Sequence, residues 1–144
     1  GKFIIIDWKT NKDPMEWRSG YYKKEWNADR SKKYKTKQFI ARKDFFKFPL
    51  SKLPYCKGNI YTLQLSMYDY LAELWGLECM GNVLCHIRPY VTAEGDIVYE
   101  ADGITRKEHE PEFHKIAYRK ADVKRLLSWH LGEISRFKQP ELSM

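Results

Sequence analysis

The sequence contains few cysteines and no long apolar run. Its three cysteines, Cys56, Cys79 and Cys85, are too sparse for a disulfide scaffold and odd in number, and they favour a reducing compartment such as a cytoplasm. No apolar stretch approaches the roughly 20 residues of a transmembrane helix, and no secretory signal opens the chain. Ser-His-Asp sets, glycine-rich phosphate loops and zinc spacings are also absent, which excludes those routes to catalysis.

The length and composition are those of one folded domain. The chain has 144 residues, of which 43% are hydrophobic and 15% aromatic, enough for a core and too many for a disordered chain. We therefore expect a single domain over residues 1–144. No internal repeat or linker divides it.

The first ten residues carry the most informative pattern. The run Phe3–Ile6 is short, rich in isoleucine and followed by polar residues, which predicts a buried strand. Asp7 and Lys9 follow it and lie on the same side of the strand, about 6.5–7 Å apart. An acid and a base are costly to place on one face of a buried strand unless they have a use.

The positive charge is concentrated in one stretch. Residues 21–47 contain ten Lys or Arg and three Asp or Glu, which accounts for the whole net charge of +7. Because basic residues suit phosphates and aromatic faces suit bases, this segment is a predicted nucleic-acid surface within a basic-aromatic insertion at about 11–58. The alternative is a solvated insertion whose aromatics pack on the core. The predicted binding residues are Lys23, Lys24, Trp26, Arg30, Lys32, Lys33, Tyr34, Lys35, Lys37, Arg42 and Lys43.

The remaining periodicity predicts alternating helices and strands. Apolar residues recur at helical spacing and form the predicted apolar stripe: Ile60, Leu63, Met67, Tyr70, Leu71 and Leu74. Asn59 is the predicted N-cap of this helix, and Gly76 is the predicted terminator. Gln64 and Tyr68 lie four apart on this helix and therefore share a face; a lone Gln there could simply bond a neighbouring backbone group. We expect strands at 83–91, 97–99 and 113–118, and an amphipathic helix at 121–137.

The combination of Asp7-Trp8-Lys9-Thr10 after an isoleucine strand and Gln64-x-x-x-Tyr68 in the next helix resembles the PD-(D/E)XK nuclease superfamily. It is most similar to the RecB-like and Cas4-like, phage-type exonuclease branch, over about residues 2–91. The resemblance implies an α/β fold with a restriction-endonuclease-like mixed sheet flanked by helices. It also implies metal-dependent DNA cleavage at DNA ends in recombination, repair or phage replication.

The same resemblance implies roles for individual residues. Asp7 and the carbonyl of Trp8 would bind Mg²⁺ or Mn²⁺, whose preferred ligands are oxygens. Lys9 would activate the attacking water and stabilise charge on the phosphate. Gln64 and Tyr68 would position Lys9 and the DNA strand.

The chain departs from the family pattern in one respect. The superfamily has further acidic ligands on an earlier helix and strand, and only six residues precede Asp7. We therefore expect the carboxy-terminal part of a nuclease, lacking the amino-terminal helix and strands, with a partner chain or upstream segment supplying the second acid. The alternatives are a split nuclease inactive alone, or a non-catalytic nucleic-acid-binding or assembly module. The first residue is Gly and not Met, which indicates processing, a tag remnant or a piece of a longer protein.

Two further patterns are weaker indications of a metal site. Some relatives in this branch hold an iron–sulfur cluster, but Cys56, Cys79 and Cys85 lack its clustered spacing and a fourth cysteine. The segment 108–114 is dense in Glu and His, but Pro111 prevents a helix with matched ligands. We interpret it as a solvated loop.

Overall fold

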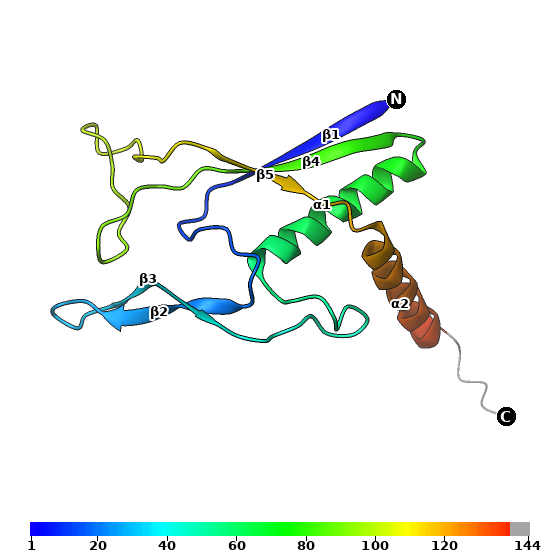
Figure 1. The fold of residues 1–144 in the computed structure, drawn as a ribbon, viewed down its shortest axis with the longest axis horizontal. Helices are drawn as coiled ribbons and strands as arrows, with labels where there is room; N and C mark the ends of the chain where they lie inside the picture. The colour runs from blue at the N-terminus through cyan, green and yellow to red at the C-terminus, as the bar shows by residue number, and fades with distance from the viewer. Residues whose placement is uncertain (139–144) are drawn as a thin grey trace.

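The computed structural model describes residues 1–138, in which five strands and two helices form a small α/β protein (Figure 1). A three-stranded mixed sheet has the order β1-β4-β5, with β1 parallel to β4 and β4 antiparallel to β5. A second, two-stranded antiparallel sheet consists of β2 and β3. The elements are β1 (Lys2–Lys9), β2 (Gly20–Trp26), β3 (Lys33–Ala41), α1 (Lys57–Leu74), β4 (Glu78–His86), β5 (Glu112–Ile116) and α2 (Lys120–Lys138).

The β1, α1 and β4 elements form one crossover unit. Parallel strands need a long connection, and the chain between β1 and β4 supplies it with α1. The register pairs Asp7 with Leu84 and Lys9 with His86. The carboxyl ends of both strands therefore lie at the same end of the sheet. The polar residues after the isoleucine run lie there beside the last residues of β4.

The helix α1 begins and ends close to the predicted positions. Its N-cap is Cys56, and not Asn59 as predicted; the side chain of Asn59 instead donates to the carbonyl of Pro54 at 2.9 Å. Gly76 follows the helix at a φ of +85°, and its N–H donates to the carbonyl of Glu73. The predicted glycine terminator is thus confirmed.

The buried face of α1 differs from the predicted apolar stripe. Thr62, Leu65, Ser66 and Asp69 are buried against the sheet, while residues of the stripe such as Leu74 are exposed. Two polar members of the buried face bond to neighbouring elements. Asp69 accepts a hydrogen bond from the side chain of Asn82 in β4, and the hydroxyl of Ser66 accepts one from the N–H of Arg119. These bonds lower the cost of burying the two side chains, although Oδ1 of Asp69 is buried without a hydrogen-bond partner among the described residues.

The strand β1 is not buried as predicted. It lies at the edge of its sheet, and alternate side chains are exposed on the face opposite α1: Ile4 is 61%, Ile6 55% and Trp8 59% exposed. The other face meets the core, where Ile5 packs with Leu65, Leu84 and Ile116.

The predicted mixed sheet and two helices are present, but only α1 packs directly on the sheet. The helix α2 packs against α1 (Figure 1). Its start at Lys120 agrees with the prediction, and Val123 on its first turns is buried. Residues 139–144 of the predicted domain lie outside the described residues.

The segment between β1 and α1 has more structure than the sequence indicated. It contains the β2–β3 hairpin, whose register shifts between Tyr22 and Lys24. That bulge breaks the period-two alternation that would have identified the strands. The predicted strand at 83–91 begins earlier, at Glu78, and ends at His86; beyond it, Val91 and Ile97 form a single bridge around the predicted turn.

None of the helices in the described part of the chain is long and apolar enough to cross a membrane.

Candidate active site

The end of β1 holds Asp7 and Lys9 side by side. Their side chains share the face that meets α1, because they alternate with Trp8. The Nζ of Lys9 lies 2.9 Å from Oδ2 of Asp7, and both side chains are largely covered, with 18% and 26% exposure respectively. Asp7 Oδ2 is buried and has no partner with hydrogen-bond geometry. The contact is therefore a charge pairing, and a further ligand could reach this covered oxygen only if the pair separated.

Gln64 and Tyr68 of α1 complete this group. Lys9 Nζ donates to Gln64 Oε1 at 3.5 Å, and Gln64 Nε2 donates to the hydroxyl of Tyr68 at 3.2 Å. Gln64 thus bonds two side chains, and not the neighbouring backbone that was the alternative. The ammonium of Lys9 also lies 4.3 Å from the ring centre of Tyr61, one turn earlier on the helix.

Three residues beside Lys9 were missed from the sequence. The side chain of Asn11 donates from Nδ2 to the hydroxyl of Tyr61 at 2.8 Å. The backbone carbonyl of Asn11 lies 2.9 Å from Nε2 of His86. His86 is completely buried, and this burial lowers its pKa below the usual histidine value, although the Asn11 carbonyl opposes the shift. The Asn11 carbonyl therefore fixes the proton of a neutral ring on Nε2. The one signal available in the sequence was that His86 lies within the strand predicted at 83–91.

The oxygen donors at this site fit a divalent metal in part. Asp7 supplies a carboxylate, one oxygen of which is paired with the Lys9 ammonium. The carbonyl of Lys9 accepts from Ile87 on the β4 side, and because successive strand residues direct their carbonyls to opposite sides, the carbonyl of Trp8 points to the free edge of β1. One carboxylate and one carbonyl match the low number of protein ligands that Mg²⁺ often has, the rest being water and substrate oxygens. Among residues 1–138, no group of three or more His, Cys, Asp or Glu is placed to hold a metal.

The predicted nucleic-acid residues separate into two sets. Six of them line a cleft of about 1000 Å³, which we call the basic cleft: Lys24, Lys32, Lys33, Tyr34, Lys35 and Lys37. The other five, Lys23, Trp26, Arg30, Arg42 and Lys43, do not line it. The guanidinium of Arg42 instead lies over the ring of Tyr21, and that of Arg30 over Trp26. The predicted patch is therefore divided between the lining of the basic cleft and the surface outside it.

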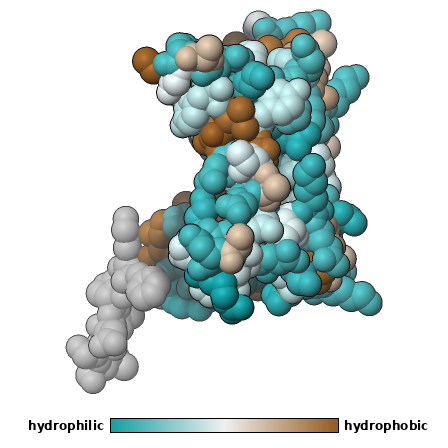
Figure 2. Space-filling model, turned by 90° about the vertical axis from the view of Figure 1, so that its left-hand side faces the viewer, coloured by the Kyte–Doolittle hydropathy of each residue, from teal (hydrophilic) through white to brown (hydrophobic). Residues whose placement is uncertain are grey.

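Two basic residues of the patch are paired with acids from other segments of the chain. Lys35 lies 2.6 Å from Asp13, and Lys32 pairs with Asp96. The sequence could not show this, because these acids lie outside the basic stretch. Hydrophilic side chains predominate on this end of the molecule, as Figure 2 shows.

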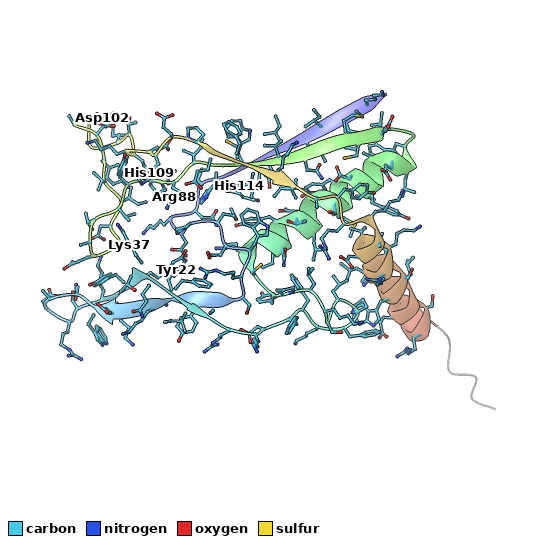
Figure 3. All side chains as sticks on the ribbon, in the orientation of Figure 1. Tyr22, Lys37, Arg88, Asp102, His109 and His114 are labelled. Atoms are coloured by element: carbon cyan, nitrogen blue, oxygen red, sulfur yellow. The ribbon has the colours of Figure 1, made fainter. Side chains whose placement is uncertain are left out.

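The opposite wall of the basic cleft comes from the segment after β4. Arg88 and His109 face Tyr22 and Lys37 of the hairpin across it (Figure 3). The ring of His109 stacks on Tyr90 with 3.8 Å between the ring centres. This wall was not foreseen, because the segment 108–114 was interpreted as a solvated loop. The floor includes Asn11, so that the cleft begins two residues beyond Lys9.

Comparisons with family models, with curated proteins and with solved structures found no match to this chain. The interpretation of the site therefore depends on its own residues and geometry.

Proposed function

We propose that the chain is a metal-dependent DNA nuclease domain of the exonuclease type, acting on DNA ends. The observation that carries the proposal is the grouping of Asp7, Lys9 and Gln64, which come from segments 55 residues apart in the sequence. The residues of the motif are thus within reach of one another at the end of β1, with the hydroxyl of Tyr68 beyond Gln64.

Each residue has a chemical task in this proposal. Asp7 and the Trp8 carbonyl would hold Mg²⁺ or Mn²⁺, which when bound supplies a Lewis acid for the phosphate and lowers the pKa of a water molecule. Lys9 places a positive charge where the phosphate gains negative charge in the transition state. Gln64 holds the Lys9 ammonium through its Oε1, and Tyr68 accepts from the amide and so fixes which end of Gln64 faces Lys9.

The pairing of Asp7 with Lys9 also explains how the two charges are tolerated. Both side chains are mostly covered, so each would be costly alone. To hold a metal and a phosphate respectively, the Asp7 carboxylate and the Lys9 ammonium would have to separate from each other.

The test is cleavage of single-stranded DNA labelled at the 5′ or the 3′ end, with Mg²⁺ or Mn²⁺ and with EDTA as the blank. Lys9→Met should abolish cleavage, whereas the matched control Lys2→Met, at the far end of the same strand, should not. Shortening that starts from one end supports an exonuclease. Equal cleavage by both variants would contradict the proposal.

A second candidate is that the chain is one part of a nuclease assembled with a further strand. The specific observation is that β1 is an edge strand within residues 1–138 and that three of its own side chains, Ile4, Ile6 and Trp8, are exposed. An added strand would pair with the free backbone groups of β1 and could bring a second carboxylate to Asp7. This candidate predicts no cleavage by the chain alone and cleavage when it is produced with its flanking coding sequence. DNA binding without cleavage in either form would favour a non-catalytic binding module.

A further inference from the structure

The basic cleft combines charge from four parts of the chain. Its lining includes eight Lys or Arg and three Asp or Glu. Lys12, Lys57 and Arg88 are outside the basic stretch of the sequence, and they add positive charge to the walls and floor. Three of these basic side chains are paired with acids, Lys32 with Asp96, Lys35 with Asp13 and Arg88 with Glu112. The remaining lysines lie mainly on the hairpin wall and the floor, and they leave the cleft with an excess of positive charge that attracts a chain of phosphates.

Aromatic rings lie within the same cleft. Tyr22 and Tyr34 line it from the hairpin, and the stacked pair of Tyr90 and His109 lines it from the other wall (Figure 3). Tyr90 is 45% exposed, so its ring remains partly open after the stacking. Aromatic faces bind bases by stacking, and only unpaired bases can leave their own stack to do so.

The outer end of the cleft is closed by the turn at residues 92–96. Lys32, at the hairpin tip, pairs with Asp96, and Lys12 donates to the carbonyl of Gly95 at 3.1 Å. The turn is itself held by a hydrogen bond from the N–H of Asp96 to the hydroxyl of Thr92. The two walls are therefore joined on the side away from Lys9, which limits the width of what can lie between them.

We propose that the basic cleft binds a single strand of nucleic acid, with phosphates on its lysines and bases on Tyr90 and the hairpin tyrosines, and that it discriminates against duplex. The proposal deepens the proposed function by naming the substrate that the same site receives. The floor of the cleft at Asn11 adjoins Lys9 through the bonds of Asn11 to Tyr61 and His86. A strand in the cleft thus leads to the Asp7–Lys9 pair.

The test is fluorescence anisotropy of a labelled oligothymidine and of a duplex of equal length, both in EDTA so that no cleavage occurs. Lys24→Glu combined with Lys37→Glu should weaken single-strand binding at least about tenfold and reduce its salt dependence. The matched control is Lys23→Glu combined with Lys43→Glu, which changes the charge equally outside the cleft. Tyr90→Ala should weaken binding by about five- to 150-fold.

The outcomes separate this inference from the proposed function. Equal losses in the two pairs of variants, or a duplex bound as tightly as the single strand, would overturn the inference. Cleavage that depends on Asp7 could still stand in that case. Conversely, single-strand binding through Lys24 and Lys37 without any cleavage would support the inference and reject the proposed function. Circular dichroism of each variant separates lost binding from lost folding.

Discussion

The ammonium of Lys9 lies 3.5 Å from the side-chain carbonyl of Gln64, although 55 residues separate them in the sequence. The contact exists because β1 and α1 belong to one crossover unit in which Ile5 and Leu65 pack in the same core. Gln64 is in turn bonded to Tyr68. The position of the ammonium is therefore set by a helix on the other side of the core and not by β1 alone.

The first prediction concerns Gln64 as a positioning residue. Gln64→Leu keeps the volume of the side chain and removes both hydrogen bonds, so Lys9 loses one fixed partner. We expect the rate of cleavage to fall by about tenfold to a hundredfold, the range that small misplacements of catalytic groups produce, with DNA affinity nearly unchanged. Single-turnover cleavage and anisotropy measure the two quantities separately.

Tyr68→Phe is the graded control for that prediction. It removes only the hydroxyl that accepts from Gln64 and leaves the contact of Gln64 with Lys9. Its effect on the rate should be smaller than that of Gln64→Leu. A larger effect would mean that Tyr68 acts on the substrate directly.

The second prediction tests which face of α1 is buried. Leu65 is completely buried and Leu71 is 48% exposed. Leu65→Ala should lower the free energy of unfolding by about 2–5 kcal/mol, because it leaves a cavity in the core. Leu71→Ala should change it by about 0.5 kcal/mol or less. Urea denaturation of both variants decides between this arrangement and the apolar stripe; similar losses would contradict it.

The third prediction is a pH dependence of stability through His86. Its pKa is lowered in the folded protein because the ring is buried, so the unfolded chain binds a proton more readily. The contribution of His86 is therefore full above its usual pKa and is lost as the pH falls below that value, at up to about 1.4 kcal/mol per pH unit. Urea denaturation at pH 7.5 and pH 5.5 should show this loss.

The matched variants for that experiment are His86→Gln and His130→Gln. Glutamine can still donate to the carbonyl of Asn11 but does not titrate, so His86→Gln should flatten the pH dependence. His130 is exposed, and its replacement should leave the dependence as it is. Identical curves for His86→Gln and the unmodified protein would show that His86 is not the group responsible.

The fourth prediction concerns the hairpin that forms one wall of the basic cleft. Gly20 begins β2 with a φ of +150°, and a Cβ there would lie 2.2 Å from the carbonyl oxygen of Ile40. Gly20→Ala should therefore destabilise the hairpin by about 1–3 kcal/mol, the cost of a strained backbone position. Hydrogen exchange should show faster exchange in β2 and β3 with little change in α1. Unchanged protection of the hairpin would contradict the structure there.

The correct predictions of secondary structure depended on local sequence patterns. The strand before Asp7, the helix that carries Gln64 and the glycine that ends it were all identified from periodicity and turn chemistry. These features depend on neighbours in the sequence, so the sequence alone shows them. The shared face of Asp7 and Lys9 follows from strand geometry in the same way.

The errors arose where tertiary contacts override local pattern. The stripe from Ile60 to Leu74 predicted the buried face of α1, but hydrogen bonds to Asp69 and Ser66 allow a more polar face to be buried. The strand β1 was predicted to be buried because it is rich in isoleucine, yet every second side chain lies on the face opposite α1 and is exposed. The second wall of the basic cleft was missed because Arg88, Tyr90 and His109 meet the hairpin only in three dimensions.

The most direct test of the account is the dependence of DNA cleavage on the carboxylate of Asp7. End-labelled single-stranded DNA is incubated with Mn²⁺ and the unmodified chain, Asp7→Asn, or the control Asp44→Asn, which changes an exposed acid away from the site. The account predicts progressive shortening of the DNA by the unmodified chain and by Asp44→Asn, and none by Asp7→Asn. Equal cleavage by Asp7→Asn, or no cleavage by the unmodified chain while it binds the DNA, would contradict the claim that this chain is a nuclease on its own.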